Sequence, residues 1–283
     1  MKSNKKIYLY QLLDIIVFMN NPFEIKKNKV IVPLLVNIPH SSTYIPLEVK
    51  DRFLINNTDL QEELLRITDR YTEEIFSCVA ELGGISVKYN YSRLVLDPER
   101  FRDDKKEIMA TKGMGVIYIK GSNGRKLREI NKNEREMLLQ NLYDPYHRAI
   151  IKEVQALLTK FGECLIIDAH SFPAIPLPYE NFKEIKRPQI CLGTDPYHSP
   201  EYLIEFVRNF FEEINLTTEL NMPFAGCYVP SKFIHQEKRV KSIMIEINRG
   251  LYLEERTGEK NDSFSKVKNI IRSLVSQLIA EFY

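Results

Sequence analysis

Two histidines and a glutamate, each beside or within a short apolar run, are the residues of this chain best suited to do chemistry. His40 and His170 each stand within three residues of the end of such a run, and Glu246 is the only charge in a third. Runs of this kind are typical of buried parallel strands, whose carboxyl ends bind ligands in open α/β sheets. Each residue alone would fit a hydrogen-bonded strand end, but the three together favour a divalent metal ion that activates water.

A hydrolytic zinc site takes three protein ligands and keeps one position for water. No His-Glu-x-x-His motif is present, so a third ligand must join His40 and His170 from elsewhere. Asp69 is the best candidate, although an aspartate there would also suit a helix N-cap, and both interpretations stay open. Asp168 lies two residues before His170, so both side chains point to one side of a strand, where Asp168 would contact the metal or orient one of its ligands.

Other charged or titratable residues fit roles around such a centre. A buried Glu246 needs a partner, a metal nearby or a raised pKa as a general base, and Arg249 is the alternative structural partner. His147 is either a proton donor, a substrate contact or a helix-packing residue. Arg93 and Arg100 would bind an anionic substrate, because a guanidinium holds a carboxylate through two hydrogen bonds.

The elements that must position these residues alternate between strand and helix. This order predicts a three-layer α/β fold, with a mostly parallel mixed sheet and helices on both faces. We expect one domain over 1–283, because no linker divides it, with 1–29 as an accessory segment. Strands are expected at 29–38, 85–91, 94–96, 116–119, 164–168, 190–193 and 242–247, and helices at 7–19, 58–68, 69–82, 131–142, 146–160, 200–214 and 263–282.

Composition excludes some classes of function. The 40 basic and 38 acidic residues nearly balance, which argues against a nucleic-acid-binding surface. The four cysteines form no C-x-x-C pair and are expected to be reduced thiols, with Cys227 in a loop and a poor candidate for a nucleophile. His198 and His235 are expected to be solvated. The segment 7–19 is too short and too polar to cross a bilayer, so we expect a cytoplasmic protein without a membrane partner. The oligomeric state stays open.

An ordered set of motifs resembles the N-formylglutamate amidohydrolase family. The match runs from about residue 30 to residue 253. Its pieces are Pro39-His40-Ser41, Asp69-Arg70-Tyr71, Ser92-Arg93-x-Val95-x-Asp97-x-x-Arg100, Pro145-Tyr-His147, Asp168-Ala-His170-Ser171, Pro223-Phe-x-Gly226 and Glu246-Ile-Asn-Arg249.

The resemblance implies a phosphorylase/hydrolase-like core, similar to that of zinc-dependent exopeptidases. It implies hydrolysis of an N-formyl or N-acyl amide of a small acidic amino acid, with Zn²⁺ or another divalent ion as cofactor. The expected ligands are His40, Asp69 and His170, and the expected catalytic residues are Glu246 and His147. Substrate contacts are expected from Arg93, Arg100, Ser41 and Asn248.

Three positions depart from the family pattern, and they keep two alternatives open. Glu99 replaces a usual asparagine, and its charge beside a carboxylate pocket would oppose an acidic substrate. Glu73 replaces an aspartate, and Cys227 replaces a glycine. The alternatives are a peptidase-like amidase acting on cell-wall or other small peptides, and a non-catalytic ligand-binding descendant.

Overall fold

A seven-stranded mixed sheet forms the centre of the protein. The computed structural model describes residues 21–180 and 186–283, so the helix expected at 7–19 lies outside the described residues. The strand order is β1-β3-β2-β4-β7-β5-β6, and the four strands β3, β2, β4 and β7 run parallel. The strands of this sheet are β1 (Phe23–Lys26), β2 (Leu34–Ile38), β3 (Ile85–Tyr89), β4 (Cys164–Phe172), β5 (Ile190–Gly193), β6 (Thr218–Leu220) and β7 (Val240–Asn248).

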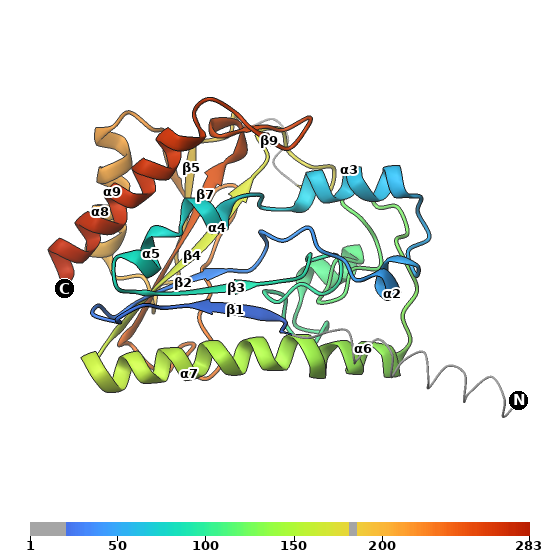
Figure 1. Cartoon of the computed structure of the whole chain (residues 1–283), viewed down its shortest axis with the longest axis horizontal. Coiled ribbons are helices and arrows are strands. Elements are labelled where there is room, and N and C mark those ends of the chain that lie inside the picture. Colours follow the sequence, from blue (N-terminus) through green and yellow to red (C-terminus); the bar gives the residue numbers. More distant parts are fainter. Residues whose placement is uncertain (1–20, 181–185) are drawn as a thin grey trace, which may run out of the picture.

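Helices cover both faces of the sheet and confirm the predicted three-layer α/β architecture. Figure 1 shows α7 along one side of the strands and α4, α5 and α9 along the other. A small hairpin pairs β8 (Leu253–Glu254) with β9 (Glu259–Lys260). The helices are α2 (Leu47–Lys50), α3 (Asn57–Ile67), α4 (Thr72–Ile75), α5 (Cys78–Glu81), α6 (Lys132–Leu138), α7 (Asp144–Phe161), α8 (Glu201–Glu213) and α9 (Phe264–Phe282), with single turns η1 (Ile108–Lys112), η2 (Leu139–Tyr143) and η3 (Arg249–Leu251).

Strand β4 is buried along its whole length, and its two faces enter different apolar clusters. Leu165 and Ile167 pack with residues of α5, α8 and α9, whereas Cys164 and Ile166 pack with residues of α7. Because side chains alternate along a strand, Asp168 and His170 continue the face that α7 covers. The sequence therefore places polar groups on one face of β4 beyond the end of its apolar stretch.

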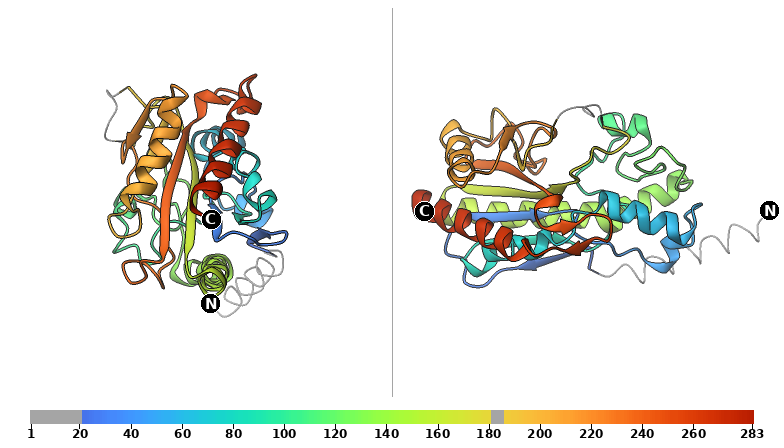
Figure 2. Two further views of the ribbon diagram at one scale, coloured as in Figure 1. Left: turned by 90° about the vertical axis from the view of Figure 1, so that its left-hand side faces the viewer. Right: turned by 90° about the horizontal axis from the view of Figure 1, so that it is seen from above.

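The carboxyl ends of the parallel strands point towards the loop-rich end of the molecule. Figures 1 and 2 show α3 and the region 90–131 at this end, and α8 at the opposite end. The edge strands β1 and β6, of four and three residues, were not expected from the sequence. Since β1 pairs antiparallel with β3, part of the segment 1–29 belongs to the main sheet and is not merely accessory.

Several expected boundaries are wrong for local reasons. Asn56 caps α3 through its side chain, so the helix begins one residue before the expected start at 58. The helix expected at 69–82 is two short helices that begin after Tyr71, whose φ of 66° breaks the run. Pro145 does not separate two helices, because it lies in the first turn of α7 and the wide turn η2 joins this helix to α6.

Two expected strands and the start of the helix expected at 200–214 also differ from the structure. Residues 93–95 form a turn and residue 96 has no regular structure, and residues 116–119 contribute only isolated bridges such as that between Met114 and Tyr118. The N-cap of α8 is Pro200, while the Ser199 hydroxyl donates to the Ser242 carbonyl. None of the described helices has a stretch apolar and long enough to cross a membrane.

Candidate active site

Three parallel strands bring the predicted chemical residues to one edge of the sheet. His40 follows β2, His170 lies near the end of β4, and Glu246 lies near the end of β7. The register pairs His170 with Glu246, so both side chains stand on the same face of the sheet. Asp69 reaches this edge from the loop between α3 and α4, where its backbone N–H donates to the His40 carbonyl at 3.0 Å.

The three residues expected to bind metal present their donor atoms to one point. His40 Nδ1 lies 3.3 Å from His170 Nδ1, His170 Nδ1 lies 3.0 Å from Asp69 Oδ2, and His40 Nδ1 lies 3.7 Å from Asp69 Oδ2. Ligands of a tetrahedral zinc ion, bound at 2.0–2.1 Å, lie about 3.4 Å apart. All three side chains are buried. The donor set and its spacing therefore fit a small divalent cation.

The atoms of these residues that face away from this point are all held by neighbours. His40 Nε2 lies 2.8 Å from Asp97 Oδ1, and Arg249 Nη2 donates to Asp69 Oδ1 at 2.8 Å. His170 Nε2 lies 3.2 Å from an oxygen of Asp168, as its position two residues away predicts. Carboxylates behind the imidazoles fix the orientation of each ring and leave its Nδ1 as the atom available to bind a cation.

These contacts decide two alternatives that the sequence left open. The side chain of Asp69 caps no helix, because Tyr71 is the N-cap of α4, and it contacts His170 instead. Arg249 is not the ion-pair partner of Glu246 among the described contacts, because its guanidinium donates to Asp69, to Ser171 and to the Arg66 carbonyl. The N-cap interpretation of Asp69 is therefore wrong. Arg249 forms no hydrogen bond with Glu246 among the described residues, although its positive charge partly offsets the rise that burial causes in the pKa of Glu246.

Glu246 is a buried carboxyl group with an uncompensated oxygen. Its Oε2 has no hydrogen-bond partner in the described part of the chain. Burial raises the pKa of Glu246 to about 7, although the positive charge of a protonated His170 would lower it. A carboxyl group with such a pKa exchanges protons readily near neutral pH.

Asp97 links His40 to the arginines Arg93 and Arg100, a role that sequence reasoning missed. Its Oδ2 accepts hydrogen bonds from Arg93 at 2.7 and 3.0 Å and from the Tyr118 hydroxyl at 2.8 Å, and Arg100 Nε lies 3.6 Å away. Burial would raise the pKa of Asp97, but Arg93 and His40 hold it well below its usual range. The only signal in the sequence was a carboxylate directly after the apolar triplet 94–96.

Glu99 points at the centre of the site. Its Oε2 lies 2.9 Å from His170 Nε2, and its other oxygen accepts a hydrogen bond from Asn37, which also donates to Asp168. Glu99, Asp168 and His170 thus form a second group of possible metal ligands beside the first. Burial and the charge of Asp168 raise the pKa of Glu99 to about 7.

His147 lies behind this cluster, and both of its ring nitrogens are engaged. Nε2 lies 2.8 Å from the Pro98 carbonyl oxygen, and Nδ1 lies 3.0 Å from the Tyr228 hydroxyl. Burial lowers the pKa of His147 to about 4, so the ring is neutral at pH 7. Tyr228 also donates its backbone N–H to Asp168 at 2.9 Å, which connects His147 to the site through two steps.

Ser41 and Asn248, two expected substrate contacts, differ in their surroundings. Ser41 is buried directly after His40. Asn248 uses both ends of its amide for the backbone: Nδ2 donates to the Pro188 carbonyl, and Oδ1 accepts from the Gly250 N–H. These bonds fix the turn after β7.

One of three expectations about polar side chains outside the site is not met. His198 is buried rather than solvated, because Nδ1 contacts the Val240 carbonyl and Nε2 accepts the N–H of His235. His235 is exposed as expected, and its Nε2 lies 2.8 Å from Asp195. Cys227 is partly buried, and burial raises its pKa to about 11, which disfavours a thiolate.

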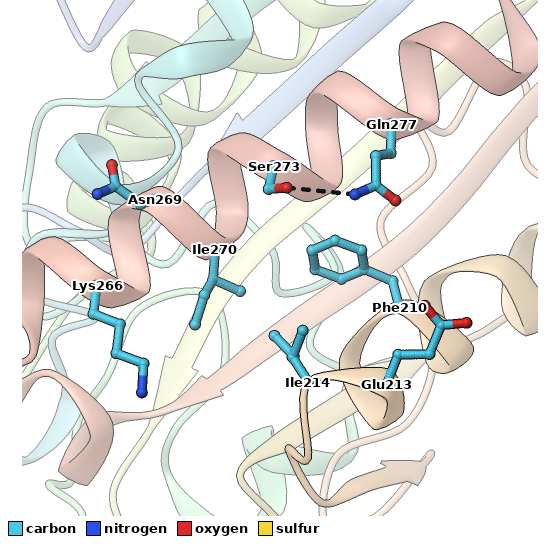
Figure 3. Close-up of a pocket in the computed structure, with 8 residues that line it drawn as sticks. All are labelled: Phe210, Glu213, Ile214, Lys266, Asn269, Ile270, Ser273 and Gln277. Atoms are coloured by element: carbon cyan, nitrogen blue, oxygen red, sulfur yellow. Dashed lines mark hydrogen bonds between the residues drawn. The ribbon is translucent and has the colours of Figure 1, made fainter.

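A groove of about 600 Å³ lies apart from this site, between α8 and α9. Figure 3 shows Phe210, Ile214 and Ile270 on its apolar side and Ser273 hydrogen-bonded to Gln277 on its rim. Its lining contains no histidine or cysteine and only one carboxylate. The groove is therefore unsuited to the chemistry that the cluster at the strand ends supports.

Fold and site together define a three-layer α/β protein with a buried group of His and Asp side chains, able to hold a metal ion, at the carboxyl edge of its sheet. The chain belongs to the N-formylglutamate amidohydrolase family, whose model matches residues 32–253. It is 28% identical to an N-formylglutamate deformylase of Pseudomonas aeruginosa and 25% identical to one of Pseudomonas putida. Each alignment covers 88% of this chain and 93% of the relative.

Solved structures share the fold. A crystal structure of N-formylglutamate amidohydrolase from Ralstonia eutropha JMP134 superposes with a TM-score of 0.77 at 24% identity, covering 92% of this chain and 97% of the other. The gene product Atu2144 from Agrobacterium tumefaciens superposes with a TM-score of 0.69 at 16% identity, covering 93% and 96%. These likenesses confirm the predicted fold class.

Proposed function

We propose that this protein is a metal-dependent amidohydrolase that cleaves the N-formyl amide, or a closely related short N-acyl amide, of an acidic amino acid. One observation carries the proposal: three buried donors of His40, Asp69 and His170 lie 3.0–3.7 Å apart, with their opposite atoms held by carboxylates or a guanidinium. Family membership and relatives named N-formylglutamate deformylase support the reaction.

His40 Nδ1, His170 Nδ1 and Asp69 Oδ2 would hold a zinc or similar ion. Such an ion supplies Lewis acidity towards a carbonyl oxygen and makes a bound water more acidic. The neutral form of each ring is the ligand, and the carboxylates of Asp97 and Asp168 keep each Nε2 proton directed away from the cation.

Glu246 would carry the proton in the reaction. Its carboxylate accepts a proton from the attacking water as the new C–O bond forms, and it donates this proton to the leaving nitrogen as the C–N bond breaks. The products are formate, or another short carboxylate, and the free amino acid. The missing partner at Oε2 and the raised pKa of Glu246 both suit this transfer.

The remaining predicted residues would orient the substrate and the site. Arg93 and Arg100, beside Asp97, would attract and orient a substrate carboxylate near the reacting amide. Ser41 and Asn248 would border the substrate. The ring of His147 is neutral, and both of its nitrogens are engaged in hydrogen bonds. These two facts favour a positioning role behind Glu99 over proton donation.

The test is elemental analysis of the purified protein followed by an assay of N-formylglutamate hydrolysis with and without a chelator. We expect about one divalent ion per chain, activity that the chelator removes, and recovery when the ion is restored. A parallel panel contains N-acetylglutamate, N-formylglutamine and short cell-wall peptides. Full activity in metal-free protein would exclude the metal-dependent mechanism, and cleavage of the peptides alone would select the peptidase-like alternative.

A further inference from the structure

Arg187 is a buried arginine near the site that the proposed mechanism does not use. Its side chain is only 4% exposed. The guanidinium carbon lies 5.4 Å from the centre of the Phe172 ring and 5.7 Å from that of Phe224, and Nη1 donates to the Pro173 carbonyl at 2.9 Å. Two aromatic faces and a carbonyl hold the planar cation in one orientation.

Phe172 places this guanidinium one step along the sheet from the proposed metal ligands. It is the last residue of β4 and follows His170 by two residues, so both side chains lie on the same face. Two residues of strand span about 6.6 Å. Arg187 also interacts electrostatically with Glu246 and with Tyr179. Phe172 thus places Arg187 beyond His170, at the carboxyl end of β4.

The hydrogen bonding of Arg187 is incomplete. Glu180 accepts from Nη2, but Nε is buried and has no partner among the described residues. A buried charged donor without an acceptor is costly, and a guanidinium binds a carboxylate best through two parallel N–H groups. Arg100 Nε is a second buried donor without a partner among the described residues, whereas Arg93 donates twice to the ionised Asp97.

We propose that Arg187 binds the side-chain carboxylate of the acidic amino acid, while Arg93 and Arg100 take the carboxylate next to the amide. Five bonds separate the formyl carbon from the distal carboxylate carbon of N-formylglutamate, and these bonds span about 6 Å when extended. Phe172, whose ring centre lies 5.4 Å from the Arg187 guanidinium carbon, follows His170 along β4 by a similar distance of about 6.6 Å. The inference rests on the proposed function, and it identifies glutamate-like substrates as those whose second charge is recognised.

The test compares Arg187→Gln with the wild type on N-formylglutamate and on the uncharged analogue N-formylglutamine. Loss of a charged hydrogen bond should raise KM for N-formylglutamate about 10- to 100-fold and change kcat little. KM for N-formylglutamine should stay within about threefold, so the preference for the acidic substrate collapses. Arg239→Gln, an exposed arginine at the start of β7, is the matched control and should behave as the wild type.

Glu180→Gln separates substrate binding from a structural ion pair. If Arg187 serves only to hold Glu180, both variants should raise KM equally, and that result would overturn the proposal. If Arg187 binds substrate, removal of the Glu180 carboxylate that competes for it should leave KM for N-formylglutamate unchanged or lower it.

A calorimetric measurement on Glu246→Gln protein gives a readout without turnover. Equal affinities of this protein for N-formylglutamate and N-formylglutamine would also overturn the proposal. A wild type that binds the acidic ligand selectively but hydrolyses neither would overturn only the proposed function.

Discussion

His170 is the residue on which most of the site converges. Its Nδ1 faces His40 and Asp69, and its Nε2 faces Asp168 and Glu99. With carboxylates against both nitrogens, the ring has one favourable orientation, and a cation at Nδ1 would find its ligand already aligned. The single residue thus couples the proposed metal ligands to the carboxylates behind them.

Replacement of Glu246 separates catalysis from metal binding. Glu246→Gln should keep the ion, because Glu246 is not among the three converging donors, and should lower kcat by at least about 100-fold, because the amide cannot carry the proton. Elemental analysis and steady-state kinetics on one preparation check both parts. Glu205→Gln, on the exposed face of α8, is the control. A near-normal kcat would assign Glu246 a structural role.

Replacement of Asp97 tests the support behind His40. In Asp97→Asn the amide no longer provides a charged acceptor for His40 Nε2, so affinity for the ion should fall about 10- to 100-fold. Competition with a chromogenic chelator measures this change. The variant also releases Arg93 and Arg100 from their shared counter-charge. Unchanged metal affinity would show that ring orientation depends on other contacts.

At the scale of residues, the sequence predicted the converging set but not its surroundings. His40, His170 and Glu246 were predictable because each interrupts or ends an apolar run. Asp97 and Glu99 lie in a region without periodicity, and the histidines that they contact are at least 57 residues distant along the chain. No local sequence pattern predicts contacts between residues so far apart, so the positions of Asp97 and Glu99 in the site could be known only from the three-dimensional structure.

Helix α7 connects the core to the site through His147. The ring of His147 holds Pro98 from one loop and Tyr228 from another. Leu157 and Val154, farther along the same helix, pack in the core. A change at His147 therefore tests whether α7 fixes the two loops.

The pH dependence of stability should reveal this helix–loop contact. The pKa of His147 is about 4 in the folded chain and about 6.5 when unfolded, so the unfolded state binds more protons between these values. The stability that the neutral ring contributes is complete above about pH 6.5 and is lost as pH falls towards 4, with a limiting slope of about 1.4 kcal/mol per pH unit. Urea unfolding at pH 7 and pH 5 should show a smaller loss for His147→Gln than for the wild type. Equal losses would mean that the ring is protonated without penalty.

Elements were predictable where they are long and periodic. Strands β4 and β7 and helix α9 have apolar stretches that burial alone explains. The three- and four-residue strands β6 and β1 lack such a signal, because pairing with neighbouring strands defines them. The left-handed Tyr71 divides a stretch whose side chains otherwise follow a helical period.

For the whole molecule, a bound cation should add to the stability of the fold. The site gathers several buried carboxylates and three arginines. An ion that binds only the folded protein raises the free energy of unfolding by about 2.7 kcal/mol when its concentration is 100 times the Kd. For a chain of this size the gain corresponds to a rise in Tm of about 5–10 °C. Calorimetry with saturating zinc and with chelator measures it. His170→Ala should lose both the ion and the shift, and a shift that survives in this variant would point to binding elsewhere.

The hydrogen bonds behind the two imidazoles have a practical consequence for preparing the protein. Since Asp97, Asp168 and Arg249 already hold the donors in place, loading and stripping the ion would need no rearrangement of the chain. Batches that differ only in buffer history would then look identical by circular dichroism and gel filtration while turning over substrate at very different speeds. Ion content measured on the same aliquot is thus the quantity against which any rate for this enzyme should be normalised.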